Sequence, residues 1–231
     1  MEKIILSKNI LEVNEKDAKK NRKLFKDKNI FVINIMGSPG CGKTTILESL
    51  IKLMKKTFKI AVIEGDLSTD KDACRIKKIG IPVVQINTDN IGNACHLNSR
   101  MISLAFKSLK QSNIDILFIE NIGNLVCPAE FDLGENLRIS ITSISEGDDK
   151  VSKYPPIFYN SDMVLITKTD LLPYFKYNIK QVEKNIEKIN PKAKIFKTSV
   201  KNKKDIVNLI EAIKDKIISY KSISISNKKL L

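Results

Sequence analysis

The stretch GSPGCGKTT at residues 37–45 has the residue types and spacing of a phosphate-binding loop. It matches the pattern G-x-x-x-x-G-K-[ST], in which a glycine-rich turn and the start of a helix hold phosphates with backbone N–H groups. The lysine of this pattern reaches the β- and γ-phosphates, and the next hydroxyl coordinates magnesium. Lys43 and Thr44 are therefore expected to be catalytic. The predicted nucleotide-binding residues of the loop are Gly37, Ser38, Pro39, Gly40, Cys41, Gly42, Lys43, Thr44 and Thr45.

Two carboxylates stand where later strands are expected to end. The segment VIEGDLSTDKD at 62–72 places Asp66 just beyond a strand, at the sheet edge where open α/β proteins bind ligands. The segment LFIENIG at 117–123 places Glu120 at a second strand end and Gly123 three residues later, as in the acid-x-x-Gly turn that senses a γ-phosphate. We expect both acids to be catalytic, and either one is a candidate magnesium ligand, directly or through water.

The segment LITKTDLLP at 165–173 predicts recognition of guanine, because it resembles the N/T-K-x-D element of GTPases. Asp170 would accept hydrogen bonds from guanine N1–H and N2–H, and the Lys168 stem would cover the ring. Adenine cannot supply this donor pair. Thr167 stands where asparagine is usual, which weakens one contact but leaves the carboxylate. A later loop fits the segment whose backbone contacts the guanine oxygen, and it adds three expected binding residues: Ser199, Val200 and Lys201.

A third group of residues has the chemistry of metal ligands. Cys95 is followed directly by His96, the only histidine of the chain. Apolar residues recur at helical spacing after this pair, which therefore lies near a predicted helix N-terminus, where the dipole favours the thiolate form. Cys127 follows Glu120 by seven residues, so one short segment would link a metal there to the γ-phosphate turn. Alone, the three residues are a weak metal signal, because their spacing fits no zinc finger and buried free cysteine is common.

The elements that position these residues are predicted by apolar, β-branched runs separated by helix-length segments. Such runs indicate strands buried on both faces, and their alternation with helices predicts an α/β fold with a mostly parallel sheet flanked by helices, of the P-loop NTPase type. Residues 136–150 break the alternation, because polar and apolar positions alternate there, and we expect an extra edge strand with one exposed face. The expected buried strands lie at 30–36, 59–64, 82–87, 115–120, 163–167 and 193–199.

Length and composition favour one main domain, since the chain has 231 residues and 42% of them are hydrophobic. Residues 1–28 are expected to form an N-terminal helical segment, in which 14–28 are amphipathic. The nucleotide-binding domain is predicted at 29–220, and a flexible C-terminal tail at 221–231. The apolar side of the N-terminal helix is predicted to carry Ala18, Leu24 and Phe25.

Charge and hydropathy argue against several other classes of protein. The formal net charge is +14, but lysines are spread along the whole chain, and no stretch interleaves basic and aromatic residues, so we do not expect a nucleic-acid partner. No apolar run is long enough to span a membrane and the N-terminus is charged, so a cytoplasmic protein without a membrane partner is expected. Four cysteines in a chain this long favour reduced thiols or metal ligands over a disulfide framework.

Taken in order, these motifs resemble the HypB family, the nickel-handling GTPases of nickel–iron hydrogenase maturation, whose G domain is of the SIMIBI type. The resemblance runs from about residue 21 to about residue 209. It is carried by NRKLFKDKNIFVINIMGSPGCGKTT, GDLSTDKDACRI, PVVQINT, CHL, ENIGNLVCPAEFDLGE, EGDDK, KYP and TKTDLLPY. It implies a magnesium-dependent GTPase that slowly converts GTP to GDP and phosphate, and that dimerises with nucleotide bound.

The resemblance also implies a metal site at the dimer interface and partners in hydrogenase maturation. By motif matching, Cys95, His96 and Cys127 would bind Ni²⁺ or Zn²⁺. The magnesium ligands would come from Thr44 and the carboxylates of Asp66 and Glu120. The implied partners are a second copy of the chain, a HypA-like maturation protein and the hydrogenase large subunit.

The chain departs from this family at three points. Relatives often carry a second histidine four residues after the first, where this chain has Arg100. The sequence also lacks the N-terminal cysteine motif and the histidine-rich stretch of some relatives, so we expect neither high-affinity nickel capture nor nickel storage at the N-terminus. Cys41 and Cys74 match no metal position of the family and are expected to be small, buried or half-buried residues.

Two alternative functions remain open at this level. The related nickel GTPase of urease assembly is one, although the CHL element and the ENIGNLVCP segment argue against it. A P-loop kinase is the other, because a phosphate loop alone does not distinguish a kinase from a GTPase. Asp170 in its TKTD setting argues against the kinase.

Overall fold

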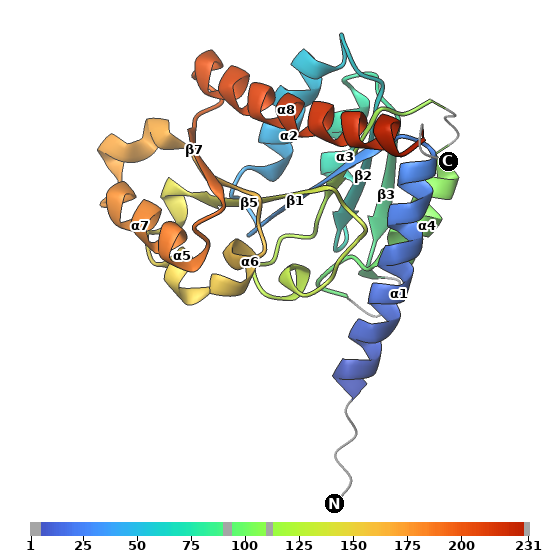
Figure 1. The fold of residues 1–231 in the computed structure, drawn as a ribbon. Coiled ribbons are helices and arrows are strands. Elements are labelled where there is room, and N and C mark those ends of the chain that lie inside the picture. Colours follow the sequence, from blue (N-terminus) through green and yellow to red (C-terminus); the bar gives the residue numbers. More distant parts are fainter. Residues whose placement is uncertain (1–5, 90–93, 110–112, 229–231) are drawn as a thin grey trace, which may run out of the picture.

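The structure is a computed structural model that describes residues 6–89, 94–109 and 113–228. Within these residues a parallel sheet of seven strands is covered by helices on both faces (Figure 1). The strands follow the order β3-β2-β4-β1-β5-β6-β7, and every neighbouring pair is parallel. The predicted α/β fold is confirmed. The strands are β1 (Phe31–Gly37), β2 (Ile60–Asp66), β3 (Val83–Asn87), β4 (Ile116–Glu120), β5 (Leu137–Ser143), β6 (Met163–Thr167) and β7 (Lys194–Thr198).

The helices divide between the two faces of the sheet (Figure 1). Helices α2, α3 and α8 pack on one face, and α1, α4, α5, α6 and α7 pack on the other. Their bounds are α1 (Leu6–Asp27), α2 (Lys43–Met54), α3 (Lys71–Lys77), α4 (Ser99–Ser108), α5 (Lys150–Lys153), α6 (Pro155–Tyr159), α7 (Ile179–Ile189) and α8 (Lys203–Lys228). Short 3₁₀ turns lie at Cys127–Ala129, Ile144–Glu146 and Thr169–Tyr174.

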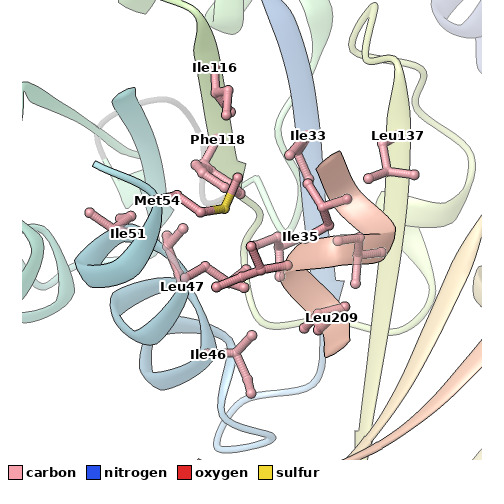
Figure 2. Packing of buried hydrophobic residues seen from close by; sticks show 14 of the residues in the cluster. Ile33, Ile35, Ile46, Leu47, Ile51, Met54, Ile116, Phe118, Leu137 and Leu209 are labelled. Carbon is pink, nitrogen blue, oxygen red and sulfur yellow. The ribbon is translucent and has the colours of Figure 1, made fainter. Parts of the chain in front are cut away.

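Strand β1 lies at the centre of the sheet, and its residues are apolar except for Asn34 and Gly37. Successive side chains of a strand point to opposite faces, so a strand covered on both faces favours apolar residues on both. Ile33 and Ile35 pack with Leu47 of α2 and Phe118 of β4 (Figure 2). Val32 belongs to the core on the opposite face, under α1 and α4. The β1 strand is therefore fixed between two cores, and its carboxyl end presents the phosphate loop in a defined position.

The expectation of an edge strand at 136–150 is wrong. Strand β5 pairs with β1 on one side and with β6 on the other, so it lies inside the sheet. Its polar residue Ser140 faces α6 rather than water. Ser140 is fully buried, and its hydroxyl donates to the carbonyl of Ile157 over 3.0 Å. A buried hydroxyl that has a hydrogen-bond partner is tolerated in a core. The alternation of polar and apolar residues in β5 therefore does not mean that one face of the strand is exposed to solvent.

The first helix lies within the helical segment expected at 1–28, and the last helix runs beyond the expected end of the G domain. Helix α1 starts at Leu6, and its Ala18 and Phe25 are buried as expected, with the Phe25 ring at 5.2 Å from that of Phe106 in α4. Helix α8 continues to Lys228, beyond the predicted domain end at 220. Residues 1–5 and 229–231 lie outside the described residues. The division into helical segment, G domain and flexible tail stays a prediction. None of the helices in the described ranges is long and apolar enough to cross a bilayer.

Candidate functional site

The phosphate loop connects β1 to α2 and frames a cavity of about 510 Å³. Gly42 precedes α2 with a φ of 104°, a left-handed conformation that favours glycine. The Lys43 ammonium donates to the carbonyls of Gly37 and Ser38, at 3.2 Å each, so it lies over the loop. The cavity is lined by Pro39, Gly40, Gly42, Lys43, Thr44, Thr45, Asp66, Leu67, Asp72, Arg75, Glu120, Ile122, Gly123 and Lys168. Both predicted acids therefore line this cavity with six of the nine predicted loop residues, whereas Gly37, Ser38 and Cys41 do not line it.

Buried carboxylates approach this cavity from two neighbouring strands. Glu64 of β2 is the register partner of Glu120 of β4, and both are 2% exposed. Burial raises the pKa of Glu64 to about 8, with the Glu120 charge adding to the shift, and burial raises the pKa of Glu120 to about 7. Within the described residues, the Oε2 atoms of both groups have no hydrogen-bond partner. Buried carboxylate oxygens without a protein partner are donors that a hard divalent cation can take in place of a proton.

The oxygen ligands at this position therefore fit magnesium. Thr44 Oγ1 donates to Glu120 Oε1 over 2.7 Å, which joins the helix start to the end of β4. Ligand atoms of Glu64, Asp66 and Asp72 lie within 4.8 Å of one another. Magnesium binds carboxylate and hydroxyl oxygens, usually with several waters retained. A site between these groups would neutralise a concentration of negative charge that burial otherwise makes costly.

Three residues of this region were missed in the sequence. Glu64 ends the apolar run KIAVIE, and a lone acid in a strand buried on both faces is the signal that could have identified it. Asp72 and Arg75 lie on the short helix α3 and line the cavity, with their Oδ1 and Nη1 atoms 2.9 Å apart. Arg75 also donates to Glu48 and to Thr45 Oγ1 of α2, so it ties α3 to the helix that follows the phosphate loop.

The turn after β4 lies directly against the phosphate loop. A Cβ atom on Gly123 would come within 2.9 Å of Pro39 Cγ and 3.0 Å of Pro39 N, which leaves room only for glycine. Next to it, Asn124 forms an antiparallel bridge with Gly37. The predicted acid-x-x-Gly turn and the phosphate loop therefore pack directly against each other. A movement of either segment displaces the other.

All of the predicted base-recognition residues except Ser199 line an adjoining cavity of about 320 Å³. Asp170 Oδ1 accepts from Ser199 Oγ at 2.7 Å, and Oδ2 lies 2.8 Å from Lys201 Nζ. The Lys201 hydrogen bond, followed by that of Ser199, holds the pKa of Asp170 below its usual range. Lys168 reaches across the phosphate loop and donates to the Gly40 carbonyl over 2.7 Å. The lining comprises Cys41, Gly42, Thr45, Ile46, Thr167, Lys168, Asp170, Leu171, Thr198, Val200 and Lys201.

Thr167, which stands where GTPases usually have asparagine, contacts the phosphate loop. Its hydroxyl donates to the Cys41 carbonyl over 2.7 Å and lies 3.2 Å from the Thr142 carbonyl. The end of β6 is therefore fastened to the phosphate loop through a threonine. This contact holds the base cavity and the phosphate cavity in a fixed relation.

The three predicted metal ligands are brought together at the side of the molecule next to α1 and α4. Cys95 Sγ lies 2.8 Å from Cys127 Sγ and 3.9 Å from His96 Nδ1. The ligand atoms of all three lie within 4.8 Å of one another, and all three residues are half-buried. The hydrogen bond with Cys95, and then burial, raise the pKa of the Cys127 thiol, while burial lowers the pKa of His96. Two sulfurs and an imidazole form a soft donor set of the kind that zinc and nickel bind.

The surroundings of this cluster orient His96. Its ring stacks on Phe131 with the centroids 3.8 Å apart and an angle of 26° between the planes. Helix α4 begins at Ser99 and is capped by the Asn98 side chain, so Cys95 and His96 lie in the loop just before the helix. Arg100, in the first turn, lines a cavity of about 320 Å³ together with His96 and Phe131. The cluster therefore opens toward a space that Arg100 borders.

The two remaining cysteines differ from each other. Cys41 is fully buried in the phosphate loop, as expected. Cys74 is exposed, so the expectation of a buried or half-buried residue is wrong there. Helix α3 turns Ala73 and Ile76 toward the core, and Cys74 points away from that face. Neither cysteine belongs to the metal cluster.

Comparison with known proteins gives a consistent result. Residues 31–197 match the family model described as CobW/HypB/UreG, nucleotide-binding domain. The chain is 43% identical over 197 residues to the hydrogenase maturation factor HypB of Azotobacter chroococcum mcd 1, which covers 85% of this chain and 64% of that protein. The chain thus spans a little under two thirds of the length of this relative.

Two further similarities cover most of both proteins. The hydrogenase/urease maturation factor HypB of Helicobacter hepaticus (strain ATCC 51449 / 3B1) is 41% identical over 216 residues, which are 92% of this chain and 87% of that one. Among solved structures, the crystal structure of HypB from Helicobacter pylori in complex with nickel is similar with a TM-score of 0.84 and 40% identity. That similarity covers 89% of this chain and 95% of the other.

Proposed function

The chain belongs to the HypB family within the CobW/HypB/UreG nucleotide-binding domains, and on this premise we propose that it is a magnesium-dependent GTPase that handles nickel in the maturation of nickel–iron hydrogenase. One observation carries the proposal. The residues that would bind the guanine nucleotide and the three soft metal ligands belong to the same structure, and the segment from Glu120 to Cys127 runs from one to the other. Such a segment can transmit the state of the nucleotide to the metal site.

The nucleotide would be held by the two adjoining cavities. Backbone N–H groups of residues 37–45 and the Lys43 ammonium would bind the phosphates, and Asp170 would accept from the guanine N1–H and N2–H groups. The shared lining of the cavities, which includes Gly42, Thr45 and Lys168, supports a single ligand that extends through both. For guanine to reach Asp170, Lys201 must give up its place on the carboxylate.

Hydrolysis would depend on positioning and on charge. Thr44, Asp66 and Glu120 would hold magnesium, which when bound neutralises charge on the phosphate oxygens. The turn from Glu120 to Gly123 would order around the γ-phosphate, next to the attacking water. Arg75 lines the cavity, but its guanidinium is already held by Glu48, Asp72 and Thr45. A slow conversion of GTP to GDP and phosphate is therefore expected, since among the described residues that line this cavity no arginine is free to meet the transition-state charge.

Nickel would be the cargo, with zinc as a competing metal. Cys95, His96 and Cys127 supply a thiolate and imidazole set that suits both ions. The solved relative from Helicobacter pylori, which is in complex with nickel, supports the choice of nickel. Binding of GTP would bring two copies of the chain together at this site. Hydrolysis, or contact with a HypA-like partner, would then release nickel toward the hydrogenase large subunit.

Urease is a second candidate recipient. The relative from Helicobacter hepaticus is named as a hydrogenase/urease maturation factor, so one protein of this family carries both roles in its name. Delivery of nickel to urease or to hydrogenase would use the same ligands at the metal site. They are distinguished only by which apo-enzyme accepts the nickel, and hydrogenase is proposed first because the Azotobacter relative is named for hydrogenase alone.

The proposal is tested with purified protein in two assays. Phosphate release is measured with GTP and ATP in magnesium buffer, for the unmodified chain and for Lys43→Ala. GTP should be hydrolysed in preference to ATP, and Lys43→Ala should abolish turnover, because the ammonium is lost from the β- and γ-phosphates. Nickel transfer is then measured by adding the nickel-loaded chain with GTP to apo-hydrogenase large subunit or to apo-urease. Equal use of ATP and GTP, or turnover that survives Lys43→Ala, would contradict the GTPase assignment.

A further inference from the structure

A buried amide, Asn121, joins the nucleotide turn to the loop that carries His96. Asn121 follows Glu120 directly and is 1% exposed. Its Oδ1 accepts from the N–H of Leu97, the residue after His96, at 3.3 Å and from the N–H of Ile122 at 3.0 Å. An amide oxygen has two acceptor positions, and here both are used. One oxygen therefore holds the turn that would meet the γ-phosphate and the loop that would meet the metal.

Leu97 contacts the second acid-bearing strand as well. Its side chain is fully buried over Gly65, where an added Cβ would come within 2.7 Å of Leu97 Cδ1. Gly65 lies between Glu64 and Asp66 at the end of β2. The loop after His96 is therefore seated on the ends of both strands that border the phosphate cavity. A displacement of either strand end changes the position of Leu97, because the interior is packed without slack.

The same amide is linked to the segment of Cys127. Asn121 Nδ2 donates to Asn34 Oδ1 at 3.3 Å, and Asn34 Nδ2 donates to Glu135 Oε1 at 3.2 Å. Glu135 Oε2 accepts from the N–H of Leu133, in the segment that begins at Cys127. All the side chains of this chain of hydrogen bonds are buried. Water cannot replace a broken link there, so loss of a partner leaves an unsatisfied polar group.

We propose that Asn121 is the positioning residue that couples the nucleotide to the metal site, through Leu97 to His96. This inference rests on the proposed function and deepens it. When the turn at 120–123 orders around the γ-phosphate, Asn121 moves with it. Leu97 then moves as well, because its N–H is hydrogen-bonded to Asn121 Oδ1. The ring of His96 then changes its place relative to Cys95 and Cys127. By linkage, metal binding must change nucleotide affinity by the same factor as nucleotide changes metal affinity.

The test compares two buried asparagines in a metal titration. Nickel affinity is measured for the GDP-bound and the GTP-analogue-bound states of the unmodified chain and of Asn121→Ala. We expect the two states to differ by about 5- to 150-fold in the unmodified chain, a usual size for such coupling. In Asn121→Ala the ratio should fall to within about twofold of one, and this ratio is the readout because loss of the contact with the N–H of Ile122 can also change the affinity for the GTP analogue itself.

Asn21→Ala is the matched control. Asn21 is also buried and donates to the carbonyls of Ser99 and Leu133, so it bridges the two metal-bearing segments without touching the nucleotide turn. This variant should weaken nickel binding equally in both nucleotide states and keep the ratio. A merely structural role of Asn121 would give the same result as Asn21→Ala, which would overturn the proposal. An unmodified chain whose nickel affinity is identical in both states would overturn it too.

Asn121→Ser and hydrogen exchange keep the test independent of folding. The serine hydroxyl is too short to span the contacts of the amide, so it should lose the coupling with less loss of volume than alanine. In the unmodified chain without metal, exchange at residues 95–97 should slow when GTP analogue replaces GDP. Unchanged exchange would contradict the link even if neither variant folds. If the unmodified chain binds no nickel, the nickel role of the proposed function fails, whereas the exchange result still decides the role of Asn121.

Discussion

The hydroxyl of Thr44 donates a 2.7 Å hydrogen bond to Glu120 Oε1, across the boundary between α2 and β4. This contact joins the residue after the loop lysine to the first residue of the turn that reaches Cys127. It is buried, and the second oxygen of Glu120 has no protein partner within the described residues. A cation that takes Thr44 and Glu120 as ligands would therefore act on the start of the segment that leads to the metal cluster.

Replacing Thr44 by alanine should raise the magnesium concentration needed for GTP hydrolysis by about tenfold or more, the value expected for losing a hydrogen bond to a charged group. The variant removes one oxygen and leaves the loop backbone intact. Phosphate release against magnesium concentration measures the change. Ser49→Ala is the control on the same helix, since its hydroxyl donates only to the Thr45 carbonyl, and it should behave like the unmodified chain. A magnesium requirement that is equal in both variants would contradict the role of Thr44.

Asp170→Asn should erase the preference for guanine. The amide keeps one acceptor but loses the negative charge, and losing a charged acceptor in a buried pair costs about 2–5 kcal/mol, or more than tenfold in affinity. The same amide can donate to the carbonyl that xanthine carries at the guanine amino position, so affinity for xanthosine nucleotides should rise. Competition binding with GTP, ATP and xanthosine triphosphate measures both effects. Asp215→Asn, on α8, controls for the change of charge.

Gly123→Ala should weaken GTP binding more than GDP binding. The added Cβ would meet Pro39 at 2.9 Å, and the turn must move away from the loop to relieve the overlap. Overpacking of this kind costs about 1–3 kcal/mol, which corresponds to roughly five- to more than a hundredfold in affinity if the turn carries it. Adding Pro39→Ala removes the nearest atom and should recover part of the loss. An equal loss for GTP and GDP, without recovery in the double variant, would show that the turn does not meet the γ-phosphate.

Cys41 should give the chain an alkaline loss of stability. Burial raises the pKa of its thiol from 9.0 to about 11, so the folded state holds the proton more tightly than the unfolded state. The sign follows from linkage: the contribution is fully present below about pH 9 and is lost as the pH rises through about 11. A shift of this size is worth about 3 kcal/mol.

Urea unfolding between pH 8 and pH 11 measures this contribution as the difference between the unmodified chain and Cys41→Ala. The difference should shrink toward the alkaline end. Cys74→Ala, at an exposed thiol, should follow the unmodified chain at every pH. Parallel curves for the unmodified chain and Cys41→Ala would refute the expectation. Alkylation at pH 8 followed by mass measurement provides a second check, because Cys74 should react and Cys41 should not.

The fold followed from the sequence where one local signal was sufficient. Runs such as IFVINIM had to be strands covered on both faces, and they alternate with helices, which leaves a parallel α/β sheet as the consistent arrangement. The position of β5 inside the sheet could not be predicted in this way. Its serine and threonine residues resemble an exposed face in the sequence, and only the neighbouring α6 shows that the Ser140 hydroxyl is bonded to Ile157. Hydrogen bonding of small hydroxyls removes the usual link between polarity and exposure.

The residues of the candidate site also fall into those that a local motif predicts and those that it does not. The phosphate loop, the TKTD element and the pairing of Cys95 with His96 are short in sequence and were predicted before any geometry. Glu64 and Asn121 were missed, because their importance depends on neighbours that lie far along the chain. Glu64 faces Glu120 only because β2 lies next to β4 in the sheet, and Asn121 meets Leu97 only because a loop folds over the end of β2. Strand order is not encoded in a local pattern, so such residues appear only with the tertiary structure.

The proposed metal site would have three protein ligands in one copy of the chain: Cys95, His96 and Cys127. Zinc prefers a tetrahedral set of four ligands, and nickel accepts planar N, O and S sets, so water or a cysteine of a second copy must complete the coordination. Arg100 cannot ligate and adds positive charge to the cavity that His96 borders. We therefore expect a weak site in the GDP-bound chain and a stronger one in the dimer that forms with a GTP analogue.

Titration of nickel and zinc into the GDP-bound, GTP-analogue-bound and nucleotide-free chain, with light scattering on the same samples, measures occupancy against mass. Cys127→Ala should abolish binding in all three states, because it removes one of the two sulfurs from each copy. Arg100→His should strengthen binding in all three, since it removes a cation and adds an imidazole to the same cavity. Cys74→Ala is the matched thiol control and should change neither occupancy nor mass. Metal binding that survives Cys127→Ala in every state would exclude the cluster, and equal affinity in monomer and dimer would exclude completion of the site by a second copy.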